Sequence, residues 1–198
     1  MKFIKENSYD IVKFFIYQIG IAVFSLTLAF PLSDAVKDTK TADIVQLCVS
    51  ILAIAFYSML VYTVTWEHGA TDRIRIDAGK SVYDGFKGAK IALIACIPNF
   101  VISAIAILSS LLYSDGNGWT AVAGITLMIL ALIESMYLGA TEFIASFVGA
   151  ESSIIYLIKS VCYFVMPLII VIAAHVGYTL GDKNIKIFGF ASKKSNKK

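Results

Sequence analysis

Charge is scarce in this sequence. Only 16% of its 198 residues are Asp, Glu, Lys or Arg, whereas a soluble domain carries about 25%. Hydrophobic residues make up 58% of the chain, above the roughly 45–50% of soluble domains. Because a chain this short forms one domain and cannot bury so much apolar surface in its own core, the excess must face lipid. The composition therefore predicts a single transmembrane domain over residues 1–198.

Clustered metal ligands are also missing. The three cysteines, Cys48, Cys96 and Cys162, lie more than forty residues apart, and the only histidines are His68 and His175. A zinc or redox site needs closely spaced thiolates or a His/Cys cluster. The sequence also has no nucleophile beside a positioned base and no cofactor fingerprint. We therefore expect no metal, no cofactor and no enzymatic activity.

A basic stripe of the kind that binds nucleic acid is absent as well. The net charge is only +3, and the basic residues lie between apolar runs or at the chain ends. Such positions fit topology control and contact with anionic lipid headgroups. We expect no nucleic-acid partner. Headgroup contacts are expected near the following residues: Arg73, Arg75, Lys80, Lys87 and Lys90.

Long apolar runs are what the sequence does contain. A bilayer core needs about 20 apolar residues per helix. Four runs meet this length: 14–32, 44–66, 89–113 and 160–180. A fifth run, 119–137, carries Glu134 near its end, and polar residues interrupt segment 138–158, which stays open as a span, a re-entrant segment or an interfacial one. The predicted fold is an all-α membrane bundle of five or six transmembrane spans.

The basic residues conflict with five simple spans. They gather in the N-terminus, the loop 67–88 and the C-terminal tail 181–198, which the positive-inside rule assigns to the cytoplasm. The turn 114–118 has no basic residue and is expected outside. Residues 119–180 must then cross once, with 119–153 dipping into or lying at the outer face, or three times at about 20 residues each. We expect a multi-pass protein of a bacterial cytoplasmic membrane with a cytoplasmic N-terminus.

The first apolar run has a second interpretation. Lys2 and Lys5 precede it, and Ser33 and Ala35 near its end resemble a signal-peptide cleavage pattern. The hydrophobic region of a signal peptide is about 7–15 residues long, and this run is longer. We therefore expect a membrane span, with cleavage of residues 1–35 as the alternative.

Three polar residues inside the predicted spans form the candidate intramembrane site: Asn99, Glu134 and His175. A carboxylate at the centre of a span costs on the order of 2.5–3.5 kcal/mol and is usually functional or paired. Pro98 should kink the third span, because proline cannot donate to the carbonyl four residues earlier and clashes with it. Asn99 would then satisfy a freed group or line a cavity. If residues 119–180 cross three times, Glu134 and His175 lie at one depth and form an ion pair.

Small residues recur at four-residue spacing in two of the apolar runs. Such stripes let helix backbones approach closely in lipid, where packing replaces the hydrophobic effect. We expect them to pack helices within the chain, with a homo-oligomer or another membrane protein as the alternative contact. The two stripes are Ala131, Ser135 and Gly139, and Ala173, Gly177 and Gly181.

Residues 66–81 form the richest polar stretch. Its Gly79-Lys80-Ser81 resembles the end of a phosphate-binding loop, but Ile74 stands where that motif needs glycine. The alternation in 73–77 is typical of a short extended segment lying against headgroups. We expect solvated loop charge here rather than a metal or acid/base cluster.

This stretch and the run His175-Val-Gly-Tyr-Thr-Leu-Gly181 resemble small polytopic membrane proteins of bacteria whose activity is not known. The resemblance implies a multi-pass membrane protein and transfers no site residues. From the residues themselves we expect a transport-related component, either a small permease or a transporter subunit. The alternative is a structural or accessory protein that packs against a partner through its small-residue faces.

Overall fold

The computed structural model describes residues 2–36, 39–80, 82–112, 118–147 and 152–185, and in this part of the chain every regular element is helical. The elements are α1 (Lys2–Glu6), α2 (Ser8–Asp34), α3 (Thr39–Asp77), α4 (Lys87–Ala95), α5 (Ile97–Leu111), α6 (Gly118–Ile133), η1 (Ser135–Tyr137), α7 (Leu138–Ser146), α8 (Ser152–Val165) and α9 (Pro167–Asp182). The turn 114–118, apart from Gly118, and the tail beyond 185 lie outside the described residues.

Three stretches of helix are long and apolar enough to cross a membrane: Ser8–Leu32, Thr41–Asp77 and Ile154–Asp182, with mean hydropathies of 1.9, 2.3 and 2.3. Two bent pairs add candidates: α4 with α5, at 54°, and α6 with the η1–α7 segment, at 93°. The described residues thus hold three to five candidate spans. The all-α membrane bundle is confirmed, and a sixth span is not found among them.

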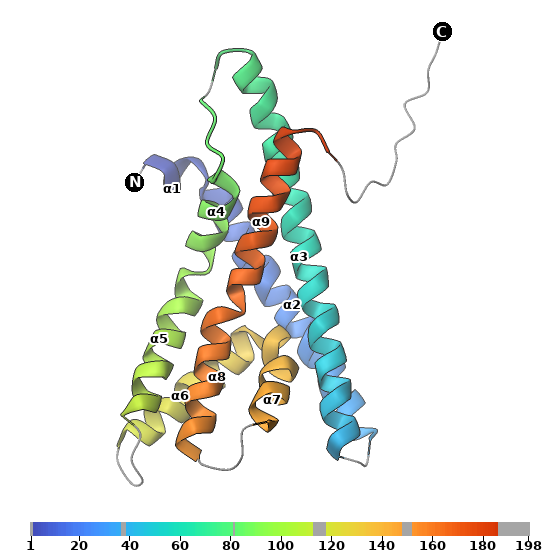
Figure 1. Cartoon of the computed structure of the whole chain (residues 1–198), viewed down its shortest axis with the longest axis vertical. Coiled ribbons are helices and arrows are strands. Elements are labelled where there is room, and N and C mark those ends of the chain that lie inside the picture. Colours follow the sequence, from blue (N-terminus) through green and yellow to red (C-terminus); the bar gives the residue numbers. More distant parts are fainter. Residues whose placement is uncertain (1, 37–38, 81, 113–117, 148–151, 186–198) are drawn as a thin grey trace.

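The two bent pairs differ in direction (Figure 1). In the view of Figure 1, α2 runs away from the end that carries α1, α3 returns to that end, and α4 and α5 together run away again. Helix α6 then climbs partway, α7 turns back, and α8 with α9 completes the return. The pair α4–α5 therefore runs from one end of the bundle to the other, whereas α6, η1 and α7 form a helical hairpin that turns back partway. This arrangement matches the alternative in which residues 119–180 cross once.

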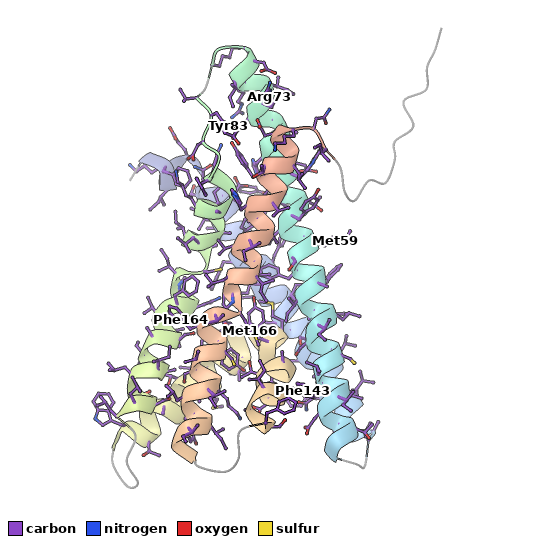
Figure 2. All side chains as sticks on the ribbon, in the orientation of Figure 1. Met59, Arg73, Tyr83, Phe143, Phe164 and Met166 are labelled. Carbon is purple, nitrogen blue, oxygen red and sulfur yellow. The ribbon has the colours of Figure 1, made fainter. Side chains whose placement is uncertain are left out.

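We call the end with α1 and the α3–α4 connection the basic end, and the other the hairpin end. Arg73 and Tyr83 lie at the basic end, Met166 in the central part and Phe143 toward the hairpin end (Figure 2). An even number of crossings leaves α1 and the end of α9 at the same end of the bundle (Figure 1).

Proline explains two of the three breaks in the bundle. Pro98 lies in the first turn of α5 and Pro167 opens α9, and each removes a hydrogen-bond donor that a continuous helix would need. The third break, at Glu134, has no proline. There the Glu134 amide still donates to the Leu130 carbonyl at 2.7 Å, and a single 3₁₀ turn lies at the 93° bend.

Helix α3 continues through the stretch expected to be a loop. Residues 67–77 are helical, so the prediction of an extended segment over 73–77 is wrong. Charge pairs at helical spacing explain the difference: Arg73 meets Asp77 at 3.1 Å and Arg75 meets Asp72 at 3.9 Å. Such pairs stabilise a helix beyond the bilayer, although the same residues alternate in polarity like a strand.

Glycines bring the helices together at three places in the two stripes. A Cβ on Gly177 would meet Thr65 and the Tyr62 carbonyl, one on Gly181 the Trp66 carbonyl, and one on Gly139 the Gln46 carbonyl. Gly177 and Gly181 therefore seat α9 on α3, and Gly139 seats α7 on α3. Of the other stripe residues, Ser135 bonds to α2, while Ala131 and Ala173 line pockets.

Candidate functional site

Glu134 lies at the tip of the re-entrant hairpin, between α6 and η1. Its side chain is fully buried, at 0% exposure, and neither carboxyl oxygen has a hydrogen-bond partner. Buried carboxylates in proteins are normally paired or hydrogen-bonded, because an isolated charge in a low-dielectric interior is very unfavourable. Glu134 is therefore held in a setting that disfavours a bare negative charge.

Hydrogen bonds fix the depth of the hairpin tip against α2. The Ser135 hydroxyl donates to the Ala22 carbonyl at 2.6 Å, and the Ser25 hydroxyl donates to the Ser135 carbonyl at 3.2 Å. The Gln18 amide reaches the Ile133 carbonyl at 3.5 Å. Since Gln18 to Ser25 is the middle of the 27-residue α2, Glu134 lies near the middle of the apolar layer.

Other ionisable and polar side chains surround the carboxyl group. Tyr57, Cys96 and Tyr137 are all buried and lie within electrostatic reach of Glu134. The Tyr57 hydroxyl donates to the Phe14 carbonyl at 3.1 Å. Tyr163 of α8 also lies within reach of Glu134, and its hydroxyl has no hydrogen-bond partner.

The face of α5 that follows Cys96 continues this polar character. Asn99 and Ser103 come three and seven residues after Cys96, which is the spacing of one helix face. Both are buried, and the Asn99 Oδ1 and the Ser103 hydroxyl have no hydrogen-bond partner. Farther along this face the Ser110 and Ser160 hydroxyls meet at 3.2 Å, joining α5 to α8.

We call this set the central polar cluster: Tyr57, Cys96, Glu134, Tyr137 and Tyr163, with Asn99 and Ser103 on the α5 face that continues from Cys96. Its unpartnered atoms stand out, because more than about 90% of buried backbone polar groups and most buried side-chain ones have a partner in folded proteins. The cluster also lies beside breaks in the helices, where Thr141 of α7 contacts Met166 at 3.8 Å. Chemically, a carboxyl group such as Glu134 can take up and release a proton.

His175 does not join Glu134. Its ring stacks on Phe86 at 5.1 Å and 10°, nine residues or about 13 Å of helix beyond the α8–α9 break. The Glu134 oxygens accept no hydrogen bond from any residue that the structure describes, so the expected ion pair is not formed. The pair required three crossings after residue 118, and the hairpin instead leaves Glu134 near the middle while α9 carries His175 toward the basic end.

The basic end holds a compact polar network. Asp72 accepts hydrogen bonds from Lys87 at 2.7 Å and from the Tyr178 hydroxyl at 3.0 Å. His68 meets Asp10 at 3.0 Å. These contacts join α2, α3, α4 and α9. Within the described residues no group of three or more His, Cys, Asp or Glu could hold a metal ion.

A pocket opens between α6, α7 and α8 toward the hairpin end, with a cavity volume of about 380 Å³. Glu142 and Lys159 line it and form an ion pair at 2.7 Å. Tyr163 also lines it, but Glu134 and Asn99 do not. The sequence left this segment unassigned, so the pocket was missed; the one available signal was a charge of each sign at 142 and 159 within otherwise apolar helices.

Fold and cluster together describe a multi-pass helical bundle with a carboxyl group buried near its middle. The chain matches no family model, no curated protein and no solved structure. Its function therefore has to be argued from its own residues.

Proposed function

We propose that this chain is a transport-related membrane component, a small permease or a subunit of a transporter, in which Glu134 takes up and releases a proton. One observation carries the proposal: the Glu134 carboxyl is fully buried with both oxygens unpartnered. Ionisable residues at membrane depth are rare and mark proton relays and ion pathways. A merely structural carboxyl group would be expected to have partners.

The helix breaks supply the second part of the argument. Transporters build their midplane sites from discontinuous helices, and one helical bundle moves against another around this fixed site. Here α4–α5 bends by 54° and α6 with the η1–α7 segment by 93°, and Cys96 at the first bend lies within electrostatic reach of Glu134. A neutral, protonated Glu134 suits the dry state, and hydration from one side would let it release its proton to water.

Orientation in the membrane is part of the proposal. The positive-inside rule puts the basic end in the cytoplasm, in a bacterial cytoplasmic membrane. Lys87 and Lys90 are already paired with Asp72 and Asp84, and Arg73 with Asp77. Contact with anionic headgroups would therefore compete with these pairs, and we expect it to be weak.

Proton movement across liposomes that contain the purified chain tests the proposal. A pH-sensitive dye inside the vesicles should report flux driven by a membrane potential, and Glu134→Gln should abolish it, because the amide cannot release a proton. Glu67→Gln, at an exposed glutamate of α3, is the matched control and should leave the flux unchanged. Equal flux from wild type and Glu134→Gln, or no flux from wild type, would remove the proton-carrying role.

The alternative is a structural or accessory protein that packs against a partner. An apolar groove on α3, of about 700 Å³, favours it: Cys48, Ile51, Leu52, Ala55, Phe56 and Met59 line this surface. The glycines of the two stripes already pack against other helices of the same chain. A partner protein that copurifies stoichiometrically in mild detergent, together with absent proton flux, would favour this alternative.

A further inference from the structure

The pocket between α6, α7 and α8 combines apolar walls with one charge of each sign. Leu127, Ala131, Leu138 and Ile155 contribute apolar side chains, and the Glu142–Lys159 pair supplies the charges. Its volume of about 380 Å³ falls within the range of roughly 300–1,000 Å³ that is usual for small-molecule sites.

The position of the ion pair calls for an explanation. Lys159 lies seven residues before Met166 at the α8–α9 break, or about 10 Å of helix from the central part of the bundle. The candidate span Ile154–Asp182 begins five residues before Lys159, so the pair lies inside an apolar segment, where charged groups are uncommon and usually functional. The side chains of Lys159 and Glu142 are 24% and 40% exposed, so both remain accessible.

The two charges select the kind of ligand. A singly charged ligand would compensate one partner of the Glu142–Lys159 pair and leave the other without its counter-charge, which is unfavourable. A zwitterion can satisfy both, with its cationic group on Glu142 and its acidic group on Lys159. Tyr163 also lines the pocket, with its hydroxyl buried and without a hydrogen-bond partner, and the apolar walls accept an uncharged tail.

We propose that this pocket binds a small zwitterion with an apolar tail. The same chemistry occurs in a free zwitterionic solute and in the headgroup of a zwitterionic phospholipid. That this zwitterion is the transported ligand rests on the proposed function.

Binding of leucine to the purified full chain in a non-ionic detergent tests the first source. Two analogues each lack one charge: 3-methylbutylamine has no carboxylate and 4-methylpentanoate has no ammonium group. Binding of phosphatidylethanolamine, followed by native mass spectrometry against anionic phosphatidylglycerol, tests the second source. Preference for either zwitterion over its singly charged counterparts supports the proposal and identifies the source.

Substitutions in the pocket test whether the zwitterion binds there. Glu142→Gln and Lys159→Met should each weaken binding of the zwitterion about tenfold or more, as expected for loss of a charge-assisted hydrogen bond. Asp84→Asn and Lys90→Met break a pair of similar geometry, 2.8 Å long at the basic end, and should leave binding unchanged. If a pocket variant fails to fold, the singly charged analogues still decide the question on the wild-type chain.

Three results would overturn the proposal: no binding of either zwitterion, analogues that bind as tightly as leucine with no preference for phosphatidylethanolamine, or pocket variants that keep wild-type affinity. The proposed function fails separately. Proton flux is measured without the zwitterion. If the chain binds the zwitterion but carries no flux, the binding site is supported and the transport function is contradicted.

Discussion

Two buried carboxyl groups in this chain differ in whether they have hydrogen-bond partners. Asp72 is 8% exposed and receives hydrogen bonds from Lys87 and Tyr178, whereas Glu134 is 0% exposed and receives none. A paired carboxylate stabilises the fold through its partners, and removing it leaves those partners buried and unpaired. An unpartnered carboxyl contributes little stability, so its retention calls for a functional reason.

Asp72→Asn should therefore lower the stability of the chain by about 1–3 kcal/mol, because the Lys87 ammonium loses its counter-charge. Glu134→Gln should leave the stability unchanged or slightly higher, because a neutral amide replaces a group whose charged form is disfavoured by burial. Thermal unfolding of both variants in one detergent provides the measurement. Equal destabilisation by the two substitutions would mean that Glu134 has a structural partner.

Glycine at 177 is a second residue-scale test. A Cβ there would meet Thr65 and the Tyr62 backbone, whereas a Cβ at Gly20 would meet nothing within 4 Å. Gly177→Ala should destabilise by about 1–3 kcal/mol through overpacking, and Gly20→Ala should be neutral or stabilise by about 0.5–1 kcal/mol through helix propensity. Unfolding midpoints compare the two. Similar behaviour of both variants would contradict the close α3–α9 contact.

At the scale of elements, the helical hairpin of α6, η1 and α7 is the feature that sequence reasoning left open. Its apolar run is long enough to span a bilayer, yet the chain bends by 93° at Glu134. Ser135 and Gly139 hold the tip against α2 and α3. These tertiary contacts compensate backbone groups that a straight helix would have satisfied by itself.

Accessibility of the two ends of this hairpin tests the re-entrant path. In a chain without Cys48, Cys96 and Cys162, cysteines at Trp119 and Phe147, which are 43% and 73% exposed, should both react with an impermeant thiol reagent from one side of the membrane. A full span between them would place them on opposite sides. Reaction of one from each side would rule out the hairpin.

At the scale of the molecule, the chain path leaves α1, the α3–α4 connection and the end of α9 at one end of the bundle (Figure 1). Val82, in the α3–α4 connection, is 94% exposed. A cysteine at Val82 in the same cysteine-free background should resist the impermeant reagent in intact cells and react after permeabilisation, because the positive-inside rule places this end in the cytoplasm. A cysteine at Phe147 is the control expected to react without permeabilisation. The reverse pattern would invert the proposed orientation.

Sequence reasoning reached the fold class because lipid imposes a simple requirement. Each span needs about 20 apolar residues, and that pattern is visible in the runs that became α2 and α3. The break beside Pro98 was likewise predictable, since proline lacks a donor wherever it occurs. The prediction of an extended segment over 73–77 was wrong, because alternation of polar and apolar residues does not by itself determine a strand. Charge pairs at helical spacing extend α3 through these residues, beyond the length that a bilayer requires.

The candidate site was only partly visible. Asn99 and Glu134 were identifiable as polar residues in apolar surroundings, while Ser103 and Tyr163 acquire significance only once α5 and α8 lie beside the hairpin. The sequence by itself determined the membrane class, the long spans and the proline breaks, because these depend on local composition. Tertiary structure alone decided that residues 118–147 turn back, that Glu134 lacks a partner and that His175 lies elsewhere, because depth and pairing depend on which helices meet.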